Sequence, residues 1–282
     1  MQSEQFDLHA NIEQRHWWFV ARREILRSVI GSVLPPSCGS TVVDVGCGTG
    51  ANLAALADSY NCLGIDTSQE AINLATQRFP DVQFVCGPAH EMPSVVRQAN
   101  LVLLCDVLEH VSDDFRLLSD LLSLAAPGTY FLITVPANPA LWSEHDRAFG
   151  HYRRYERPRF EELWHGLDAR AIFVSHFNAR LYPIVRAVRW WNRRKGRSLG
   201  AAGTDFSMPV SPVNGVLRRL FSGERRKLES LARGESPRPY GRGVSLMALL
   251  QRGEGAVEPR QRPSFIPPDS VTPIVPPVGV SV

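Results

Sequence analysis

The sequence predicts an α/β fold in which a mostly parallel, seven-stranded sheet carries helices on both faces. Short apolar runs rich in β-branched residues alternate with helical segments, which is the pattern of a parallel sheet. A glycine-rich turn after the first apolar run joins a strand to a helix, as in other sheets of this kind. No run of about 18 apolar residues exists that could span a bilayer. The 282 residues suit one large domain with added segments.

The first expected strand and helix enclose the glycine-rich turn. Residues Thr41–Val45 are mostly β-branched and favour a buried strand, whereas Ala51–Ala57 favour a helix. Glycines alternate with other residues in the turn Gly46–Gly50, so backbone N–H groups can approach a ligand without a Cβ in the way. A helix N-terminus at this point favours a carboxylate or a phosphate. The turn is therefore the first candidate binding site.

Further strands and helices follow in alternation. The later strands are expected at residues 61–66, 82–86, 99–105, 129–135, 171–177 and 244–250. The clearest helices between them are expected at 68–79 and 114–124, and another begins near Tyr155. Ligands bind beyond the carboxyl ends of parallel strands, so the residues that follow these strands are expected to meet at one edge of the sheet.

Three further segments surround this core. Residues 1–34 are expected to form an N-terminal helical lid, and residues 35–252 form the main domain. The segment 178–243 is too long for an ordinary loop between the last two strands and is predicted to be a helical insertion. Residues 253–282 are rich in proline and lack periodicity, which predicts a disordered tail.

Charge and cysteine content narrow the possible classes. The formal net charge is +3, but arginines crowd between Arg147 and Arg262, which leaves room for an anionic partner or surface. The N-terminus lacks a basic segment followed by an apolar one, so no secretory signal is expected. The five cysteines show no C-x-x-C pairing and are expected to be the reduced thiols of a cytoplasmic protein.

The turn and its surroundings resemble one enzyme family. Residues Asp44–Gly50 read D-x-G-x-G-x-G and the next strand ends in Asp66, as in class I S-adenosylmethionine-dependent methyltransferases. Two runs, E-x-x-H-W-W-F-x-x-R-R from Glu13 and W-x-x-H-D-x-x-x-G-H-x-R-R-Y from Trp142, resemble bacterial members of the ubiquinone-biosynthesis-like, small-molecule type. The resemblance implies a Rossmann-like sheet whose last two strands form an antiparallel hairpin. A nicotinamide-dependent oxidoreductase is disfavoured, because Ala51 occupies its third-glycine position.

The resemblance also implies the cofactor S-adenosyl-L-methionine. The implied cofactor contacts are Asp44, Gly46, Cys47, Gly48, Gly50, Asp66, Ala89 and Asp106. Among them, Asp66 would accept hydrogen bonds from both ribose hydroxyls, although a role as a cap of the 68–79 helix stays open. The acid that the family carries before Ala89 is replaced here by Pro88, so adenine recognition is left to backbone and packing.

The fourth strand is followed by a run that could bind a metal. Asp106-Val107-Leu108-Glu109-His110 resembles the E-x-x-E-H motif of two divalent-metal families, the ubiquinone-pathway catechol O-methyltransferases and the small-RNA 2′-O-methyltransferases. Carboxylate and imidazole ligands suit Mg²⁺, Mn²⁺ or Zn²⁺. Many class I methyltransferases use the same acid and histidine to orient the cofactor without a metal. No metal is expected, with Asp106, Glu109 and His110 as the alternative ligand set.

The loop after the fifth strand carries the candidate catalytic residues. His145 or His151 can act as a general base near neutral pH. Arg153 and Arg154 can hold a carboxylate or phosphate of the substrate. A loop held together only by Asp–Arg pairs is the alternative. Trp17 is a further candidate substrate contact. It belongs to the run that begins at Glu13, which we call the leader, and the resemblance implies that the leader folds over the cleft.

The insertion carries a second surface feature. Residues 181–197 combine Trp190 and Trp191 with arginines, which is the composition of a membrane interface, and are too short to span a bilayer. Pro183 is expected in the first turn of a helix, and a second helical segment is expected at 213–233. An amphipathic helix that packs on the sheet, with both tryptophans in the core, is the alternative.

Together these features predict a cytoplasmic methyltransferase that modifies a small molecule, with an oxygen atom as the acceptor. Peripheral contact of the insertion with a membrane is left open. A metal-dependent RNA 2′-O-methyltransferase is one alternative, but no RNA-binding module is recognisable and no nucleic-acid partner is expected. A non-catalytic membrane-surface protein that keeps the fold is another.

Overall fold

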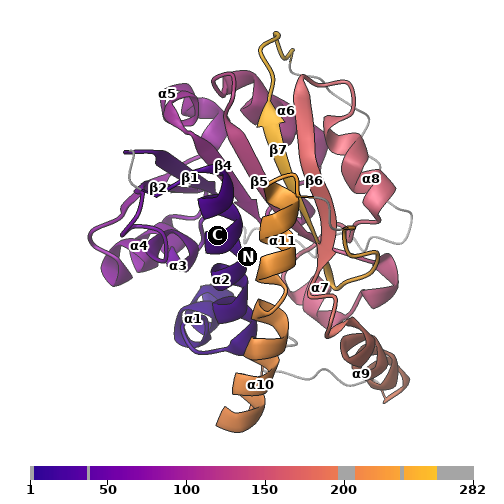
Figure 1. The fold of residues 1–282 in the computed structure, drawn as a ribbon. Coiled ribbons are helices and arrows are strands. Elements are labelled where there is room, and N and C mark those ends of the chain that lie inside the picture. Colours follow the sequence, from indigo (N-terminus) through magenta and orange to yellow (C-terminus); the bar gives the residue numbers. More distant parts are fainter. Residues whose placement is uncertain (1–2, 37–38, 196–206, 236–237, 259–282) are drawn as a thin grey trace, which may run out of the picture.

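A single seven-stranded sheet forms the centre of the computed structural model, which describes residues 3–36, 39–195, 207–235 and 238–258 (Figure 1). Its strand order is β3-β2-β1-β4-β5-β7-β6. The strands are β1 (Thr41–Val45), β2 (Asn61–Asp66), β3 (Gln83–Cys86), β4 (Leu101–Cys105), β5 (Tyr130–Pro136), β6 (Ala169–Phe177) and β7 (Ser245–Arg252). Neighbouring strands are parallel except where β7 pairs with β5 and β6. The predicted α/β fold and the antiparallel end of its sheet are confirmed.

Helices cover both faces of this sheet. They are α1 (Ser3–Ile12), α2 (Trp17–Val33), α3 (Ala51–Ala54), α4 (Gln69–Arg78), α5 (Pro93–Gln98), α6 (Asp114–Leu124), α7 (Glu144–Ala148), α8 (Arg157–Glu161), α9 (Tyr182–Lys195), α10 (Ser211–Ser222) and α11 (Arg225–Ala232). Successive strand residues point to opposite faces, so Val43 and Val102 join one core with α6, while Val42 and Leu101 join the other with α2 and α11. Both faces are therefore buried.

The position of the site follows from the strand order. Strand β1 has β2 on one side and β4 on the other, so the chain reverses its direction of progress across the sheet at β1. The loops after β1 and β4 leave the same sheet edge on opposite sides of the sheet, and a crevice opens between them. Gly46 and Asp106 are the first residues of these two loops.

The N-terminal helices and the insertion form one roof over this crevice. Figure 1 shows α2 beside α10 and α11, although these helices are far apart in the sequence. Asn214 of α10 accepts a hydrogen bond from the backbone N–H of Trp17 (2.8 Å) and donates one to the carbonyl of Arg15 (2.9 Å). The hydroxyl of Ser28 donates to Glu229 of α11 (2.7 Å). Side chains of the insertion thus hold both the start and the second half of α2 in place.

Two of the expected helices differ from the structure. Helix α3 ends at Ala54 instead of Ala57, because the N–H of Leu56 bonds to the carbonyl of Leu53 (2.8 Å) in a tighter turn. The segment expected as one helix at 213–233 is two, α10 and α11. They part at Glu224, whose buried carboxylate accepts the backbone N–H of Arg180 (2.9 Å) and so fixes a bend.

The predicted boundary of the tail at residue 253 is too early. The N–H of Gly253 bonds to the carbonyl of Asp168 (2.8 Å), and Val257 packs against the core. The rest of the expected tail, 259–282, lies outside the described residues. No helix in the described ranges is both long and apolar enough to cross a membrane.

Candidate functional site

The turn after β1 brings bare backbone to the edge of a cavity. Gly46, Gly48 and Gly50 all have positive φ (76°, 53° and 83°), a region that side chains with a Cβ avoid. A Cβ on Gly46 would stand 2.6 Å from Val107 Cγ2, and one on Gly50 would stand 2.7 Å from the ring of Phe84. A Cβ on Gly48 would meet nothing within 4 Å, so the backbone there faces open space. The spacing of the three glycines is therefore required by the turn.

Asp44 lies beneath this turn without a hydrogen-bond partner. Its side chain is fully buried, and neither carboxylate oxygen bonds to any described residue. Burial raises the pKa of Asp44 to about 7, with the Asp66 carboxylate adding to the shift and the Arg22 guanidinium opposing it. A buried carboxyl with no partner is stable as the neutral acid or beside a cation.

We expect Asp44→Asn to remove a pH dependence of stability. The carboxyl has its ordinary pKa of 3.8 when unfolded and about 7 when folded, so between these values the folded state holds a proton that the unfolded state has released. The free energy of unfolding of the wild type therefore falls as pH rises through this window, by about 4 kcal/mol. Melting temperatures measured across the window should decline more in the wild type than in Asp44→Asn. Parallel curves would contradict the shift.

Asp66 and Ala89 follow β2 and β3 at the same sheet edge. The Asp66 carboxylate accepts the backbone N–H of Gly48 (2.9 Å) and that of Ser68 (2.9 Å), so it joins the glycine turn to the start of α4. The N-cap of α4 is Ser68, not Asp66, which corrects the capping alternative. Ala89 is buried, and neither it nor Asp66 lines the large cavity described next.

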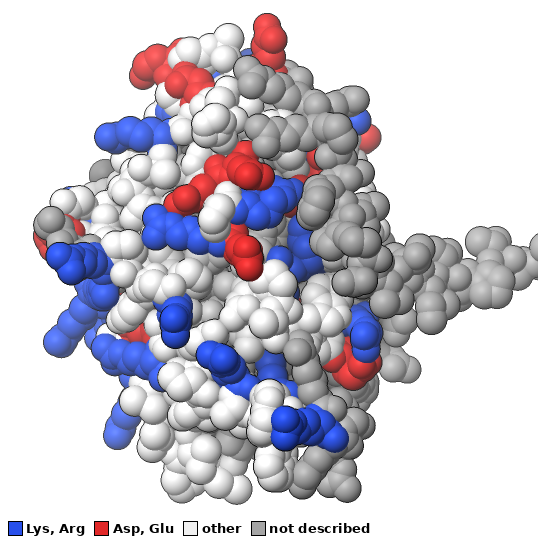
Figure 2. Space-filling model, turned by 90° about the vertical axis from the view of Figure 1, so that its right-hand side faces the viewer, with Lys and Arg blue, Asp and Glu red and all other residues white. Residues whose placement is uncertain are grey.

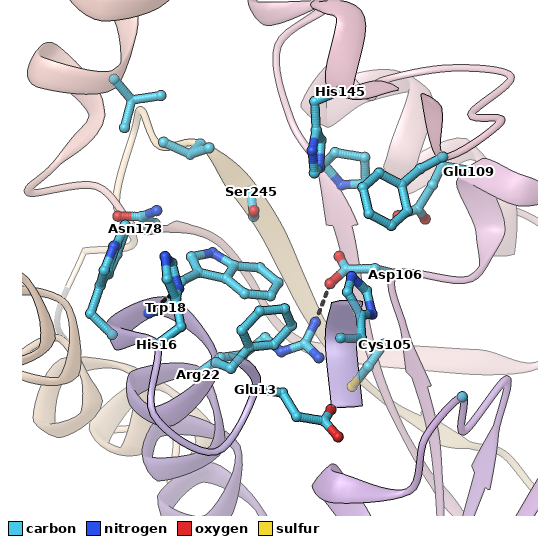
Figure 3. A pocket seen from close by; sticks show the side chains of 18 of the residues that line it. Glu13, His16, Trp18, Arg22, Cys105, Asp106, Glu109, His145, Asn178 and Ser245 are labelled. Atoms are coloured by element: carbon cyan, nitrogen blue, oxygen red, sulfur yellow. Dashed lines mark hydrogen bonds and ion pairs between the residues drawn. The ribbon is translucent and has the colours of Figure 1, made fainter. Parts of the chain in front are cut away.

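A cavity of about 410 Å³ lies under the roof, at the ends of β1 and β4. It is walled by the glycine turn, the leader, the loop after β5 and one face of α9 (Figure 3). The sequence-predicted site residues that line it are Trp17, Gly46, Cys47, Gly48, Asp106, His145, His151 and Arg154. Asp44, Gly50, Asp66, Ala89 and Arg153 do not. Half of the expected cofactor set thus shares one cavity with both expected catalytic histidines.

Arg22 of α2 forms an ion pair with Asp106 at the end of β4, and Figure 3 shows it reaching across the cavity wall. Asp106 has a positive φ of 58°, which directs the chain into the loop after β4. The second Asp106 oxygen accepts the hydroxyl of Thr134 (3.3 Å). The Arg22 side chain also reaches Asn52 of α3 (3.4 Å). A cation from the leader therefore lies beside the glycine turn.

Glu13 fastens the leader to the same turn. The hydroxyl of Thr49 donates to Glu13 (2.8 Å), and Glu13 forms an ion pair with Arg78 of α4. Arg78 also donates to the carbonyls of Thr49 (3.0 Å) and Ala10 (3.2 Å). This network is mostly buried, so it ties the leader closely to the glycine turn.

The loop after β5 presents His151 on a fixed support. Nδ1 of His151 lies 2.9 Å from Asp146, whose other partners include Nε of Arg154 (2.8 Å). Although burial opposes it, the guanidinium of Arg154 and the hydrogen bond from His151 hold the pKa of Asp146 below its usual range. An ionised Asp146 can only accept, so His151 carries its proton on Nδ1 and leaves Nε2 as a proton acceptor.

Arg153 is corrected as a substrate contact. Its guanidinium donates to the carbonyls of Val111 (2.6 Å) and Ser112 (2.7 Å) and pairs with Asp114 (3.4 Å). These partners lie outside the cavity, so Arg153 holds the loops after β4 and β5 together. The alternative of a loop knit by Asp–Arg pairs is thus true of Arg153, whereas Arg154 reaches the cavity.

Glu109, His110 and His151 form a cluster whose ligand atoms all lie within 4.8 Å of one another. The alternative metal-ligand set predicted from the sequence, Asp106, Glu109 and His110, is corrected in one position. Asp106 forms an ion pair with Arg22, and His151 is the third member of the cluster instead. Glu109 is buried and neither of its oxygens bonds to a described residue. Burial, with the Asp106 charge adding, raises the pKa of Glu109 well above its usual value. Either a proton or a cation can therefore satisfy this carboxylate.

Burial holds four histidines at the cavity neutral. Burial lowers the pKa of His9 to about 3 and that of His16 to about 4. Burial also lowers the pKa of His110 and His145 well below the usual value. The ring of His145 lies against that of Phe149, with centroids 4.5 Å apart and planes tilted by 47°, which favours a packing role over that of a base. Burial raises the pKa of the Cys47 thiol, so that wall residue stays a neutral thiol.

Three functional candidates were missed from the sequence: Glu13, Arg22 and Asp146. The signal was present, since each is a charged residue inside a run otherwise rich in aromatic side chains or histidine. Their partners Arg78, Asp106 and Arg154 come from other parts of the fold or loop. The four described cysteines form no disulfide, and Cys38 lies outside the described residues.

Comparisons with known proteins bear on the family and the fold. Residues 19–180 match the family model described as a methyltransferase domain. A trans-aconitate 2-methyltransferase of Deinococcus radiodurans is 27% identical over 76% of this chain and 92% of its own length. A demethylmenaquinone methyltransferase of Renibacterium salmoninarum is 24% identical over 64% and 68%. The crystal structure of plantazolicin methyltransferase BamL, in complex with a triazolic desmethylPZN analog and SAH, superposes with a TM-score of 0.53 at 15% identity, over 90% of each chain.

Proposed function

The chain belongs to the methyltransferase-domain family, and we propose that it transfers a methyl group from S-adenosyl-L-methionine to an oxygen atom of a small molecule. Membership confirms the family resemblance carried by Asp44–Gly50. One relative is named for trans-aconitate and another for demethylmenaquinone, which are small molecules. The observation that carries the choice of oxygen is that His151, whose imidazole is held by Asp146, lines the same cavity as the glycine turn.

The glycine turn fits S-adenosyl-L-methionine, the cofactor of this enzyme. Gly48 lines the cavity with open space where its Cβ would stand, so a ligand can lie against the backbone. Gly46, Cys47 and Gly48 would hold the methionine end, with Gly50 completing the turn. Asp66, which accepts a hydrogen bond from the N–H of Gly48, would also accept hydrogen bonds from the ribose hydroxyls. The backbone at Ala89 would contact the adenine. When bound, the cofactor supplies an electrophilic methyl group on a sulfonium.

Arg22 and Asp106 match the amino-acid end of this cofactor, which carries a carboxylate and an ammonium group. Both side chains line the cavity beside the glycine turn, and Nε of Arg22 has no partner among the described residues. A cation and a carboxylate fixed side by side complement a zwitterion, because each ligand charge finds the opposite sign. We add Arg22 to the proposed cofactor contacts. Asp44, beneath the glycine turn, would supply further negative charge toward the ammonium group of the cofactor.

His151 is placed to accept the proton of the acceptor hydroxyl. Asp146 fixes the imidazole by its bond to Nδ1, and Arg154 keeps Asp146 ionised. The hydroxyl would give its proton to Nε2 as its oxygen approaches the methyl group, and Asp146 would stabilise the imidazolium that forms. His145 lies on the same wall and contacts the acceptor instead of taking the proton.

The acceptor side of the cavity has both apolar and polar walls. Ile184, Val185 and Val188 of α9 line it, and Trp17 stands between His16 and Phe221 on the leader side. Arg154 lines the same cavity as the base, and Asp146 partly neutralises its charge. These walls suit an acceptor with an apolar body and a hydroxyl directed at His151.

A labelling experiment tests the proposed reaction. Methyl-labelled S-adenosyl-L-methionine is incubated with the protein and a panel of hydroxylated small molecules, and products are identified by mass. Transfer to hydroxyl groups is expected, together with a rise in melting temperature on adding S-adenosylhomocysteine. Labelling of amines alone would show that the acceptor atom is nitrogen and not oxygen. A melting shift with nicotinamide dinucleotides and none with S-adenosylhomocysteine would contradict the whole assignment.

A metal-assisted reaction is a second candidate, favoured by the orphaned carboxylate of Glu109. Glu109, His110 and His151 offer one oxygen and two imidazole ligands, which suit Zn²⁺ or Mn²⁺. A cation there would lower the pKa of an acceptor hydroxyl. The RNA 2′-O-methyltransferase alternative shares most of this ligand set, and a steep salt dependence of RNA binding would be its signature.

Chelation separates the two candidates. We expect methyl transfer to survive EDTA, because His151 acts as a base without a metal and Glu109 is held as a neutral acid. Glu109→Gln should retain most activity for the same reason, since the amide resembles the protonated carboxyl. Loss of activity in EDTA that Zn²⁺ or Mn²⁺ restores, with an inactive Glu109→Gln, would establish the metal-assisted reaction instead.

A further inference from the structure

The exposed apolar side chains of this protein gather at one end. Nine large hydrophobic residues are exposed in the described ranges, and eight of them lie between residues 184 and 220, with Val85 on β3 as the exception. The eight are Ile184, Trp190, Trp191, Met208, Val210, Val213, Val216 and Leu220. We call this the α9–α10 surface. Single exposed apolar residues are normal in soluble proteins, but six on two helices, with Met208 and Val210 just before α10, mark an interaction surface.

Each of the two helices has two apolar faces. In α9, Val185 and Val188 line the cavity, while Trp190 and Trp191 are 52% and 54% exposed. In α10, Leu217 lines the cavity and Phe221 is buried. The exposed residues Val213, Val216 and Leu220 follow the three- and four-residue spacing of a single helix face. The alternative that both tryptophans pack in the core is therefore wrong, because the inner face of α9 is formed by other residues.

Charge in the segment that carries this surface is mostly positive. Residues 179–223 contain nine arginines and lysines and one acid, Asp205. Arg186, Arg194 and Arg219 are exposed, and the guanidinium of Arg194 lies over the Trp190 ring at 4.0 Å. Figure 2, which views the side of the molecule that carries α8 and α9, shows mostly Lys and Arg around an uncharged area in its lower half. Apolar aromatic bulk with a basic surround complements anionic headgroups above acyl chains.

The cavity opens at the same surface. Ile184 both lines the cavity and is 56% exposed, so it stands at the mouth. Pro209 and Leu217, on the α10 side, line the cavity as well. Figure 1 shows α9 and α10 at the same end of the molecule, opposite to α5. A binding partner that contacts the α9–α10 surface would therefore lie across the entrance to the acceptor site.

We propose that the α9–α10 surface docks the protein on an anionic lipid bilayer, with Trp190, Trp191 and the α10 stripe at the level of the headgroups. The acceptor, in the part of the proposal that rests on the proposed function, is an amphiphile that enters between α9 and α10 with its hydroxyl leading. Its apolar portion stays against Ile184 and Val188. Arginines around the surface are attracted to the anionic headgroups, and their long side chains can extend to the headgroup phosphates.

Sedimentation with vesicles tests the docking. The full chain is mixed with vesicles of phosphatidylcholine alone or with about one quarter phosphatidylglycerol, at low and high salt. Binding is expected to the anionic vesicles and to weaken at high salt. Trp190→Ala/Trp191→Ala should abolish it, and Val216→Asp or Arg219→Glu should weaken it about tenfold or more, because each places less apolar area or the wrong charge at the interface.

Matched substitutions at other positions provide the controls. Val85→Asp makes the same change at the remaining exposed apolar residue, and Arg97→Glu makes the same charge reversal on α5, at the far end of the molecule. Both should bind vesicles like the wild type. Each variant is checked for folding by the melting shift with S-adenosylhomocysteine. Equal loss of binding in the control and test variants would show a general charge effect and overturn the proposal.

Two other results would overturn the docking. One is the absence of binding to either vesicle by a chain that still binds S-adenosylhomocysteine. The other is a dimer in solution that Trp190→Ala/Trp191→Ala dissociates, because the surface would then join two copies of the chain. Vesicle binding without methyl transfer to any acceptor would refute the proposed function and leave the docking intact, so the two failures are distinguishable.

Discussion

Replacing Asp66 by alanine is expected to weaken S-adenosylhomocysteine binding about a hundredfold. A carboxylate that accepts hydrogen bonds from two ribose hydroxyls contributes about 1.5 to 3 kcal/mol for each bond, and about 3 kcal/mol in total corresponds to two orders of magnitude. The variant also loses the acceptor of the Gly48 N–H (2.9 Å), which lets the glycine turn move. Calorimetric titration of wild type and variant with S-adenosylhomocysteine measures the difference.

Two further variants separate ligand contact from support of the turn. Asp66→Asn keeps one oxygen that can still accept from Ser68 or Gly48, so an intermediate affinity is expected. Asp81→Ala removes an exposed carboxylate before the start of β3, at the opposite edge of the sheet, and should leave the affinity unchanged. Full affinity in Asp66→Ala, with an ordinary melting temperature, would remove Asp66 from the cofactor contacts.

The sheet and its glycine turn could be predicted because their signals are local. Strand β4 was expected at 99–105 and begins at Leu101, and β6 was expected from 171 and begins at Ala169. The requirement for glycine at Gly46 and Gly50 arises from neighbours such as Val107 and Phe84, but its trace in the sequence is the spacing itself. Alternation and turn composition therefore predict the position of the candidate site.

The walls of the site could not be predicted because they depend on distant contacts. Arg22 and Asp106 are 84 residues apart and meet only once α2 lies on the sheet. Arg153 and Arg154 are neighbours, yet one bonds to carbonyls after β4 and the other to Asp146, the buried partner of His151. The path of the loop decides which arginine faces the cavity, and no local pattern specifies that path.

His151→Ala is expected to lower kcat about 10² to 10⁴-fold while S-adenosylhomocysteine binding stays close to that of the wild type. The imidazole is the group that takes the acceptor proton, and it comes from the loop after β5, a different segment of the cavity lining from the glycine turn. Added imidazole should restore part of the activity, because a free base can occupy the space that the side chain leaves. His165→Ala, at an exposed histidine, is the control and should be fully active.

Asp146→Asn tests how the base is held. An amide can donate to Nδ1 of His151, which would put the proton on Nε2 and remove the free lone pair that accepts the hydroxyl proton. We expect a loss of kcat comparable to that of His151→Ala, with little further loss in the double variant, because the two residues act as a unit. A folded Asp146→Asn with ordinary kcat, or an active His151→Ala, would remove the base from this position.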